Sequence, residues 1–121
     1  MEQEYIIHDW VMLNGMKAVV RESYTDADDS FVYIVNDEEY KAEDLKGVPL
    51  TSEILEKNGW KLCYGFYFST NEEGVIIRLS SKTGYVWDAY VGIRPLRSGI
   101  NNVSDLQHLL FGLGINHEME V

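Results

Sequence analysis

The first part of the chain alternates short apolar and polar segments in a way that is typical of β-strands joined by tight turns. Trp10–Leu13 and Met16–Tyr24 flank Asn14-Gly15, a pair that readily adopts the positive φ angles of a type I′ turn. We therefore expect a hairpin here. A second strand pair is predicted across the loop Asp26–Ser30, with the apolar run Phe31–Val35 as its second strand.

The segment Tyr40–Leu45 then predicts one further short strand and a helical turn. Several short strands within about 50 residues are too few to bury a flat sheet. We therefore expect residues 1–50 to form a small SH3-like β-barrel or a twisted antiparallel sheet.

A short helix is predicted after this β-rich half. Thr51 is a suitable N-cap, and Leu50 and Leu55 occupy the two positions of a hydrophobic staple around it. Asn58-Gly59 is expected to end the helix, because glycine accepts the left-handed conformation that follows a last helical turn.

The strongest β pattern of the chain follows this helix. Apolar residues alternate through Trp60–Ser69, which predicts one long strand. Turns at Asn71–Gly74 and Lys82–Gly84 connect it to Val75–Ser80 and Tyr85–Val91, giving a three-stranded antiparallel meander. The predicted buried face of the long strand consists of Trp60, Leu62, Tyr64, Phe66 and Phe68.

A second helix is predicted near the C-terminus, as the cover for the meander. Ser104 and Gln107 have the spacing of a capping box, and Asp105 lies in the first turn, where the helix dipole favours an acid. Gly114 is expected to end the helix. An apolar stripe at helical spacing is formed by Leu106, Leu109, Leu110 and Leu113.

These elements predict an α+β fold in which a β-rich half, a helix, the meander and a packing helix follow one another. A chain of 121 residues has the length of one domain. We therefore expect a single compact domain over residues 1–121, with sub-structure at 1–50 and 51–121 and a seam near Gly47–Leu50.

The two halves of the chain differ in net charge, and this difference limits the classes of partner that the protein can bind. Residues 1–50 hold 12 acids and 4 bases, a net charge of −8, and residues 51–121 hold 8 and 6, a net of −2. An acidic surface repels phosphate, so direct nucleic-acid binding is not expected. The same surface is compatible with a solvated face, a basic partner, or mimicry of nucleic acid.

The expected location is cytoplasmic, without membrane association. No apolar run approaches the ~20 residues that a membrane span requires. The start of the chain has two glutamates and lacks the basic residues and apolar stretch of a secretory signal. A lone cysteine, Cys63, excludes an internal disulfide framework and is predicted to be a partly buried structural residue.

The candidate chemical motifs are incomplete. Asp26-x-Asp28-x-Ser30 opens like a calcium loop, but Phe31 stands where glycine is needed and Asp37 where glutamate is needed. A solvated hairpin loop is the favoured interpretation. Lys82-Thr83-Gly84 matches a β-lactamase box without the nucleophile motif, and is interpreted as a turn.

No catalytic, cofactor-binding or metal-binding residue is therefore predicted. His8, His108 and His117 are scattered and lack the spacing of metal ligands. Two sets of residues are candidates for an interaction surface. They are the aromatic Tyr67 and Tyr90, and the acidic Asp28, Asp29, Glu38 and Glu39.

Three function classes follow in this order. The first is a noncatalytic protein-interaction or adaptor domain that binds another protein or itself, as in a homodimer. The second is an acidic inhibitor or nucleic-acid mimic of a mobile element. The third is an enzyme of unrecognised type, for which the sequence supplies no pocket or perturbed group.

Two segments resemble a known family. They are GVPLTSEILEKNGWKL (Gly47–Leu62) and VSDLQHLLFGLGINHEMEV (Val103–Val121). Both are similar to an uncharacterised gut-bacterial family of the Bacteroides type, whose members share P-L-T-x-E-I-L-x-K-N-G-[FW] and a C-terminal V-x-x-L-Q-H-L. The resemblance implies no activity and no catalytic residues, because the matched positions are helix caps, staples and core residues.

Overall fold

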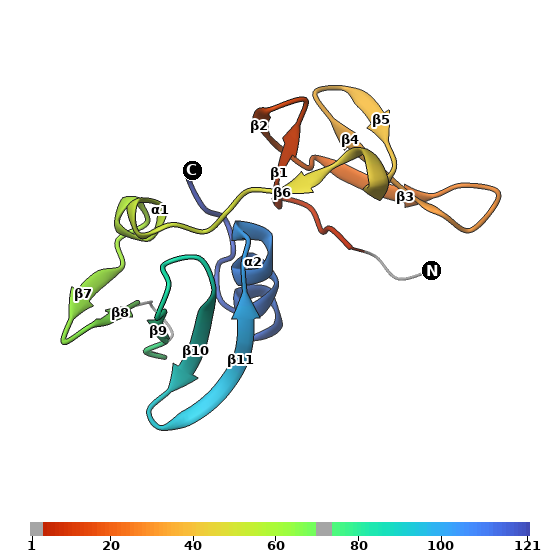
Figure 1. The fold of residues 1–121 in the computed structure, drawn as a ribbon. Helices are drawn as coiled ribbons and strands as arrows, with labels where there is room; N and C mark the ends of the chain where they lie inside the picture. Colours follow the sequence, from red (N-terminus) through yellow and green to blue (C-terminus); the bar gives the residue numbers. More distant parts are fainter. Residues whose placement is uncertain (1–3, 70–73) are drawn as a thin grey trace. The chain divides into compact units, whose positions relative to one another are not determined.

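Residues 4–69 and 74–121 are described here from a computed structural model of the chain. The chain divides into two compact units, an N-terminal unit (Met1–Val48) and a C-terminal unit (Pro49–Val121). The boundary falls inside the seam expected at Gly47–Leu50. The described residues form two α-helices and three sheets of antiparallel strands, which confirms the α+β class (Figure 1).

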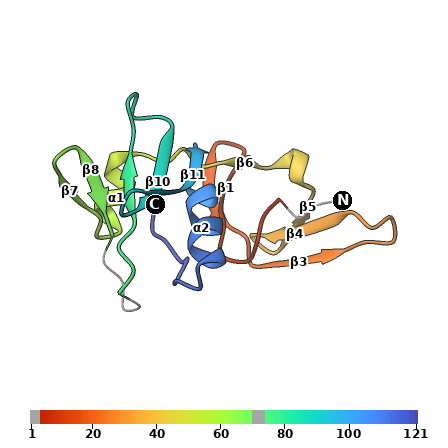
Figure 2. The ribbon, with the colours of Figure 1, turned by 90° about the horizontal axis from the view of Figure 1, so that it is seen from below.

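The N-terminal unit contains two three-stranded antiparallel sheets, with strand orders β2-β1-β6 and β3-β4-β5. As described, neither sheet is closed into a barrel, because the strands are only two to five residues long and remain in separate ladders. The strand β3 and its partner β4 form a hairpin that extends from this unit (Figure 2). The elements are β1 (Trp10–Leu13), β2 (Met16–Val19), β3 (Glu22–Thr25), β4 (Phe31–Val35), β5 (Glu38–Tyr40), the 3-10 helix η1 (Ala42–Asp44) and β6 (Lys46–Gly47).

The predicted strand Met16–Tyr24 is interrupted, because the chain changes sheets at its middle. Val20 donates its backbone N–H to the carbonyl of Asp9 at 2.9 Å, while Arg21 donates to the carbonyl of Ile34 in the other sheet at 2.9 Å. The two sheets share one core, with buried side chains from both. Its fully buried members are Val11, Val20, Tyr33 and Val35.

The hairpin predicted at Asn14-Gly15 is confirmed. The two residues have φ angles of 51° and 80°, and β1 pairs with β2 on either side of them. The second predicted strand pair, across Asp26–Ser30, is confirmed as β3 and β4. The turn predicted at Asn71–Gly74 falls, apart from Gly74, outside the described residues.

The first helix of the C-terminal unit, α1 (Ser52–Lys57), begins as predicted. The Thr51 hydroxyl oxygen accepts a hydrogen bond from the backbone N–H of Ile54 at 3.3 Å. Ile54 and Leu55 are the buried residues of this helix. A capping hydroxyl satisfies one of the free N–H groups of the first turn, so this short helix has a defined start.

The second helix, α2 (Val103–Gly112), begins two residues earlier than predicted. Its N-cap is Asn102, and Asp105 Oδ2 accepts the backbone N–H of Asn102 at 3.2 Å. Ser104, the predicted cap, is buried within the first turn. The helix lies alongside β11 in both ribbon views (Figures 1 and 2). Of the predicted stripe, Leu106 and Leu110 are buried, Leu109 is half-buried and Leu113 is exposed.

Both helices end at a glycine in the left-handed region. Gly59 and Gly114 have φ angles of 84° and 72°. In each case the next residue, Trp60 or Ile115, donates its backbone N–H to a leucine carbonyl five residues earlier, at 3.0 and 2.9 Å. This is the Schellman arrangement, and it buries the apolar residue that follows each glycine.

The sheet of the C-terminal unit is a five-stranded antiparallel meander with the order β11-β10-β9-β8-β7. Each strand therefore pairs with its neighbour in sequence. The predicted meander had three strands, so the prediction was incomplete. The strands are β7 (Lys61–Cys63), β8 (Phe66–Phe68), β9 (Arg78–Ser80), β10 (Trp87–Val91) and β11 (Arg94–Ile100).

The prediction of one long strand over Trp60–Ser69 is wrong. The chain reverses at Tyr64-Gly65, where both residues have positive φ angles, 50° and 81°, as a type I′ hairpin turn requires. Tyr64, predicted to be in the core, is 96% exposed at this turn. Leu62, also predicted to be in the core, is 58% exposed on the edge strand β7. In β8 the predicted faces are exchanged, because Phe66 and Phe68 lie on the side of the sheet opposite to the buried Tyr67.

Substitution of Gly114 tests whether the end of α2 requires a residue in the left-handed conformation. Gly114→Ala places a side chain at a φ of 72° without a steric neighbour, so we expect a loss of about 1 kcal/mol in the free energy of unfolding. The matched control is Gly112→Ala inside α2, which also meets no neighbour and should stabilise by up to ~1 kcal/mol. Urea unfolding measures both, and a stabilising Gly114→Ala would contradict the assignment.

Candidate functional site

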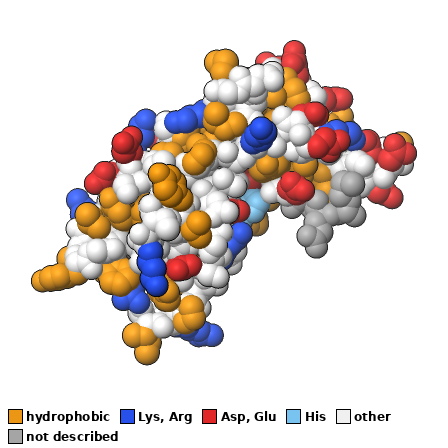
Figure 3. All heavy atoms as spheres, in the orientation of Figure 1, with side chains coloured by type: hydrophobic (Ala, Val, Ile, Leu, Met, Phe, Trp, Pro, Cys, Tyr) orange, Lys and Arg blue, Asp and Glu red, His pale blue; other side chains and the backbone are white. Residues whose placement is uncertain are grey.

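The predicted acidic residues lie on the sheet β3-β4-β5 and its loops. Asp28 and Asp29 are in the loop between β3 and β4, Glu38 and Glu39 are on β5, and all four side chains are exposed. Acidic side chains gather over these strands in Figure 3. The structure therefore brings the four residues to one sheet.

The acids do not form a single array on that sheet. Glu38 and Glu39 are consecutive in a strand, so their side chains lie on opposite faces. Glu39 shares a cross-strand row with Ile34 and Glu22, because β4 pairs with both neighbours at Ile34. Glu22 and Glu39 thus lie on the same face, on the two strands that flank Ile34.

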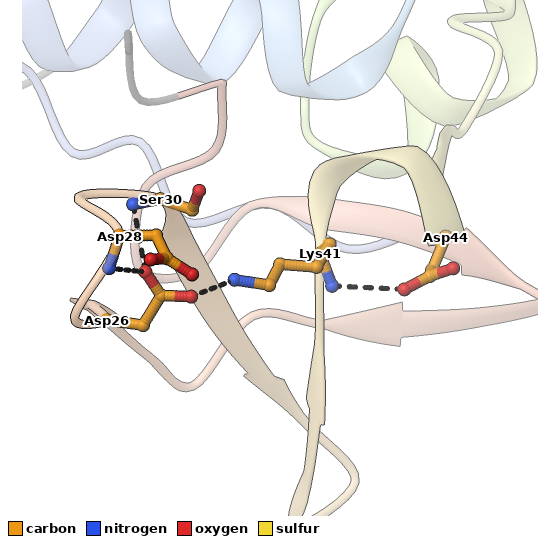
Figure 4. Close-up of polar contacts among 5 residues, drawn as sticks. All are labelled: Asp26, Asp28, Ser30, Lys41 and Asp44. Carbon is orange, nitrogen blue, oxygen red and sulfur yellow. Dashed lines mark hydrogen bonds and ion pairs between the residues drawn. The ribbon is translucent and has the colours of Figure 1, made fainter.

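The loop that opens like a calcium site is organised by its own hydrogen bonds (Figure 4). Asp26 Oδ1 accepts the backbone N–H groups of Asp28 and Ser30, at 2.9 and 3.0 Å. Asp26 Oδ2 accepts a hydrogen bond from Lys41 Nζ, and the backbone N–H of Lys41 donates to Asp44 Oδ2 at 3.1 Å. The carboxylate oxygens of Asp26 are therefore engaged within the protein.

These contacts shift the titration of both partners. The hydrogen bond from Lys41, followed by that from the Ser30 backbone, lowers the pKa of Asp26 below its ordinary value. The same hydrogen bond raises the pKa of Lys41. The charged forms of both groups are therefore favoured in the folded protein.

A shallow pocket of 240 Å³ lies beside this ion pair, lined by residues that include Val32, Asp26 and Lys41. The Tyr24 side chain and Glu39 also line it, and their hydrogen bond raises the pKa of the Tyr24 hydroxyl. Several of its polar groups are engaged with one another, namely Asp26 with Lys41 and Tyr24 with Glu39.

The ion pair predicts a pH dependence. Because the pKa of Asp26 is lowered on folding, its stabilising contribution is present above about pH 4 and is lost as the pH falls through the folded-state pKa. Asp26→Asn should lower Tm at pH 7, and the difference from wild type should shrink toward pH 2. The control is Asp29→Asn, since asparagine accepts the φ of 58° found there. Equal effects of both variants at every pH would contradict the role of Asp26.

Tyr67 was predicted as a surface residue, and this prediction is wrong. The turn at Tyr64-Gly65 places Tyr67 in register with Leu79 and Ala89, both of which are fully buried. Tyr67 is 7% exposed, and its ring centroid lies 5.8 Å from that of Trp87 in an edge-to-face contact. It belongs to the covered face of the five-stranded sheet.

The opposite face of this sheet carries a row of side chains that crosses all five strands. Residues paired directly across antiparallel strands share a face. The strand registers place one residue from each strand in this row, which we name the aromatic row. Its members, from β7 to β11, are Lys61, Phe68, Arg78, Tyr90 and Pro95.

Arg78 is the centre of the aromatic row. Its guanidinium carbon lies 4.5 Å from the ring centroid of Phe66 and 5.1 Å from that of Tyr90. Its Nε atom is buried and has no hydrogen-bond partner within residues 4–69 and 74–121. The aromatic rings thus hold the guanidinium by cation–π attraction. Phe66, Phe68, Tyr90 and Arg78 are all half-buried, so part of each side chain meets solvent.

Sequence reasoning missed this row because it assigned Phe66 and Phe68 to the core. Tyr90, predicted at the surface, lies in the row and is half-buried. One signal was present, since Arg78 interrupts the otherwise apolar run from Val75 to Leu79. A long cation in the middle of such a strand indicates a face that is not packed in the core.

Cys63 was predicted to be partly buried, and this is wrong, because it is exposed beside the turn at Tyr64. Its pairing with Phe66 places it on the same face as the aromatic row. Across the described parts of the chain, no three His, Cys, Asp or Glu side chains converge in a way that could hold a metal ion. Nor does any helix in those parts have the length and apolar character required to cross a membrane.

Comparison with protein-family models, curated proteins and solved structures finds no match.

The two tyrosines supply a stability test of the face assignment. Tyr67→Ala removes a buried ring and should cost roughly 3–5 kcal/mol, whereas Tyr90→Ala should cost much less because the ring is partly in solvent. Chemical denaturation followed by tryptophan fluorescence compares the two. A larger loss for Tyr90→Ala would show that the faces are assigned the wrong way round.

Proposed function

We propose that the chain is a noncatalytic protein-interaction domain whose binding surface is the aromatic row of the five-stranded sheet. The observation that carries the proposal is the half-buried set of aromatic side chains around Arg78. Surface aromatics and arginine are enriched in protein interfaces, where they supply most of the binding energy. Such a row gives a partner both apolar area and a fixed cation.

The N-terminal unit is proposed to be an open version of the SH3-like arrangement. Three features support this reading. The chain passes from one sheet to the other at Val20-Arg21, the 3-10 helix η1 separates β5 from β6, and β6 returns to pair with β1.

A second candidate is an acidic inhibitor or nucleic-acid mimic. The observation in its favour is the acidic N-terminal unit, with exposed Asp28, Asp29, Glu38 and Glu39 and the row that joins Glu22 to Glu39. Such a surface would bind a basic groove on another protein through charge attraction that falls as salt rises.

Three further features are part of the proposal. A cytoplasmic location and the absence of catalysis are inferred from the sequence. Membership of the Bacteroides-type family rests on the motifs in Gly47–Leu62 and Val103–Val121. The partner is another protein or a second copy of the chain.

The two candidates are separated by capture from a host lysate with matched variants. Phe68→Ser/Tyr90→Ser alters the aromatic row, and Glu38→Gln/Glu39→Gln alters the acidic strand without changing side-chain size. We expect the first variant to lose the captured partner at moderate salt and the second to retain it. Light scattering of each purified variant tests for self-association, and circular dichroism confirms that it is folded.

The opposite pattern, loss only with the glutamine variant and only at low salt, would favour the acidic inhibitor. Equal capture by both variants and the wild type would contradict both binding surfaces.

A further inference from the structure

The charge around the aromatic row is opposite in sign to that of the rest of the chain. Residues 61–100 contain five basic and three acidic residues, a net of +2, in a chain of net charge −10. Within the described part of this segment Asp88 is the one acidic residue, and its Oδ1 accepts the backbone N–H of Gly99 at 3.4 Å. The segment is therefore cationic, and on the face of the row the two cations Lys61 and Arg78 outnumber Asp88, which lies two residues from Tyr90 on β10.

The basic side chains of this region differ in whether they already contact other parts of the protein. Arg97 donates to the backbone carbonyl of Asp105 at 3.2 Å and pairs with its carboxylate at 3.4 Å, so it serves the start of α2. Lys61 and Arg78 lie in the aromatic row itself, and Lys61 is exposed. These two cations are the ones that a ligand on this face would meet.

The row fixes the separation of its two cations. Lys61 is on β7 and Arg78 on β9, two strand spacings apart, which is about 10 Å at ~4.8 Å per spacing. A peptide in the polyproline II conformation advances about 3.1 Å per residue with three residues per turn, so side chains three residues apart lie on the same side and are separated by about 9 Å. Phe68 lies between the two cations, where the peptide would present its intervening apolar residues.

The state of Arg78 favours a carboxylate as the ligand group. The rings of Phe66 and Tyr90 hold the guanidinium, so little side-chain entropy is left to lose when a ligand binds. A guanidinium presents paired N–H donors that match the two oxygens of a carboxylate. A charge that is partly removed from water is stabilised by such a counter-ion.

From these observations we propose that the aromatic row binds an extended acidic segment of a partner protein, with two carboxylates three residues apart. One carboxylate pairs with Arg78 and the other with Lys61, and the segment crosses the strands over Phe68. This inference rests on the proposed function, and it names the chemistry of the partner.

The test uses the full chain and a fluorescein-labelled probe peptide, Gly-Glu-Val-Val-Glu-Gly, with binding followed by fluorescence anisotropy. Two control peptides replace both Glu by Gln, or place the two Glu side by side. We expect the Glu-Val-Val-Glu probe to bind at least tenfold more tightly than either control, and to weaken as salt rises.

Variants of the chain locate the site. Arg78→Met keeps an apolar stem against the rings and removes the charge, so it should weaken probe binding at least tenfold. Lys61→Met should weaken it several-fold. The matched control is Lys17→Met, an exposed lysine on β2 in the N-terminal unit, which should leave binding unchanged. Circular dichroism checks that each variant is folded.

Several outcomes would overturn the inference. They are no binding of the probe, equal binding of the glutamine peptide, an unchanged affinity of Arg78→Met, or tighter binding of an oligothymidylate. If any of these occurs while Phe68→Ser/Tyr90→Ser still loses its captured protein, the interaction function stands and only the acidic partner is wrong. If that variant captures normally, the interaction function itself fails.

Discussion

The C-terminal unit depends on the burial of Trp87. The indole Nε1 donates a hydrogen bond to the Leu50 carbonyl at 3.1 Å, and the ring contacts Tyr67 edge-to-face. Leu50 in turn donates its N–H to the Asn101 carbonyl at 2.9 Å. The indole thereby joins β10 to the segment before α1, and the backbone of Leu50 joins that segment to the residue before the α2 cap. A buried indole needs such a partner, so this contact determines which face of the sheet is covered.

The second face of the five-stranded sheet is not covered by the core. Consecutive residues of a strand point to opposite sides, so the burial of Leu79 and Ala89 directs Arg78 and Tyr90 away from the core. The rings of Phe66 and Tyr90 then cover the guanidinium of Arg78, and the side chain as a whole remains half-buried. The row is therefore a consequence of the strand register as well as of the composition.

The local signals in the sequence predicted the ends of elements better than their pairing. Thr51 and Gly59 mark α1 because capping depends on residues that are adjacent in the chain. The turn at Tyr64-Gly65 was missed because tyrosine rarely adopts positive φ and the flanking apolar alternation also fits one long strand. That single omission exchanged the two faces of β8, and so placed Tyr67 at the surface and Phe68 in the core. The candidate row depends on pairing across five strands, which residue spacing does not encode.

The two units differ in how far apart in the sequence their paired strands lie. In the five-stranded meander each strand pairs with the next strand in sequence, so its ladders close through local contacts, whereas the link between Leu50 and Asn101 in that unit closes a long loop. In the N-terminal unit β1 pairs with β6. Val11 lies opposite Gly47, which is 36 residues later in the chain. Closing such a loop costs chain entropy before its contacts form. The meander is therefore the part of the chain expected to assemble first, with its aromatic row in place before the acidic unit has closed.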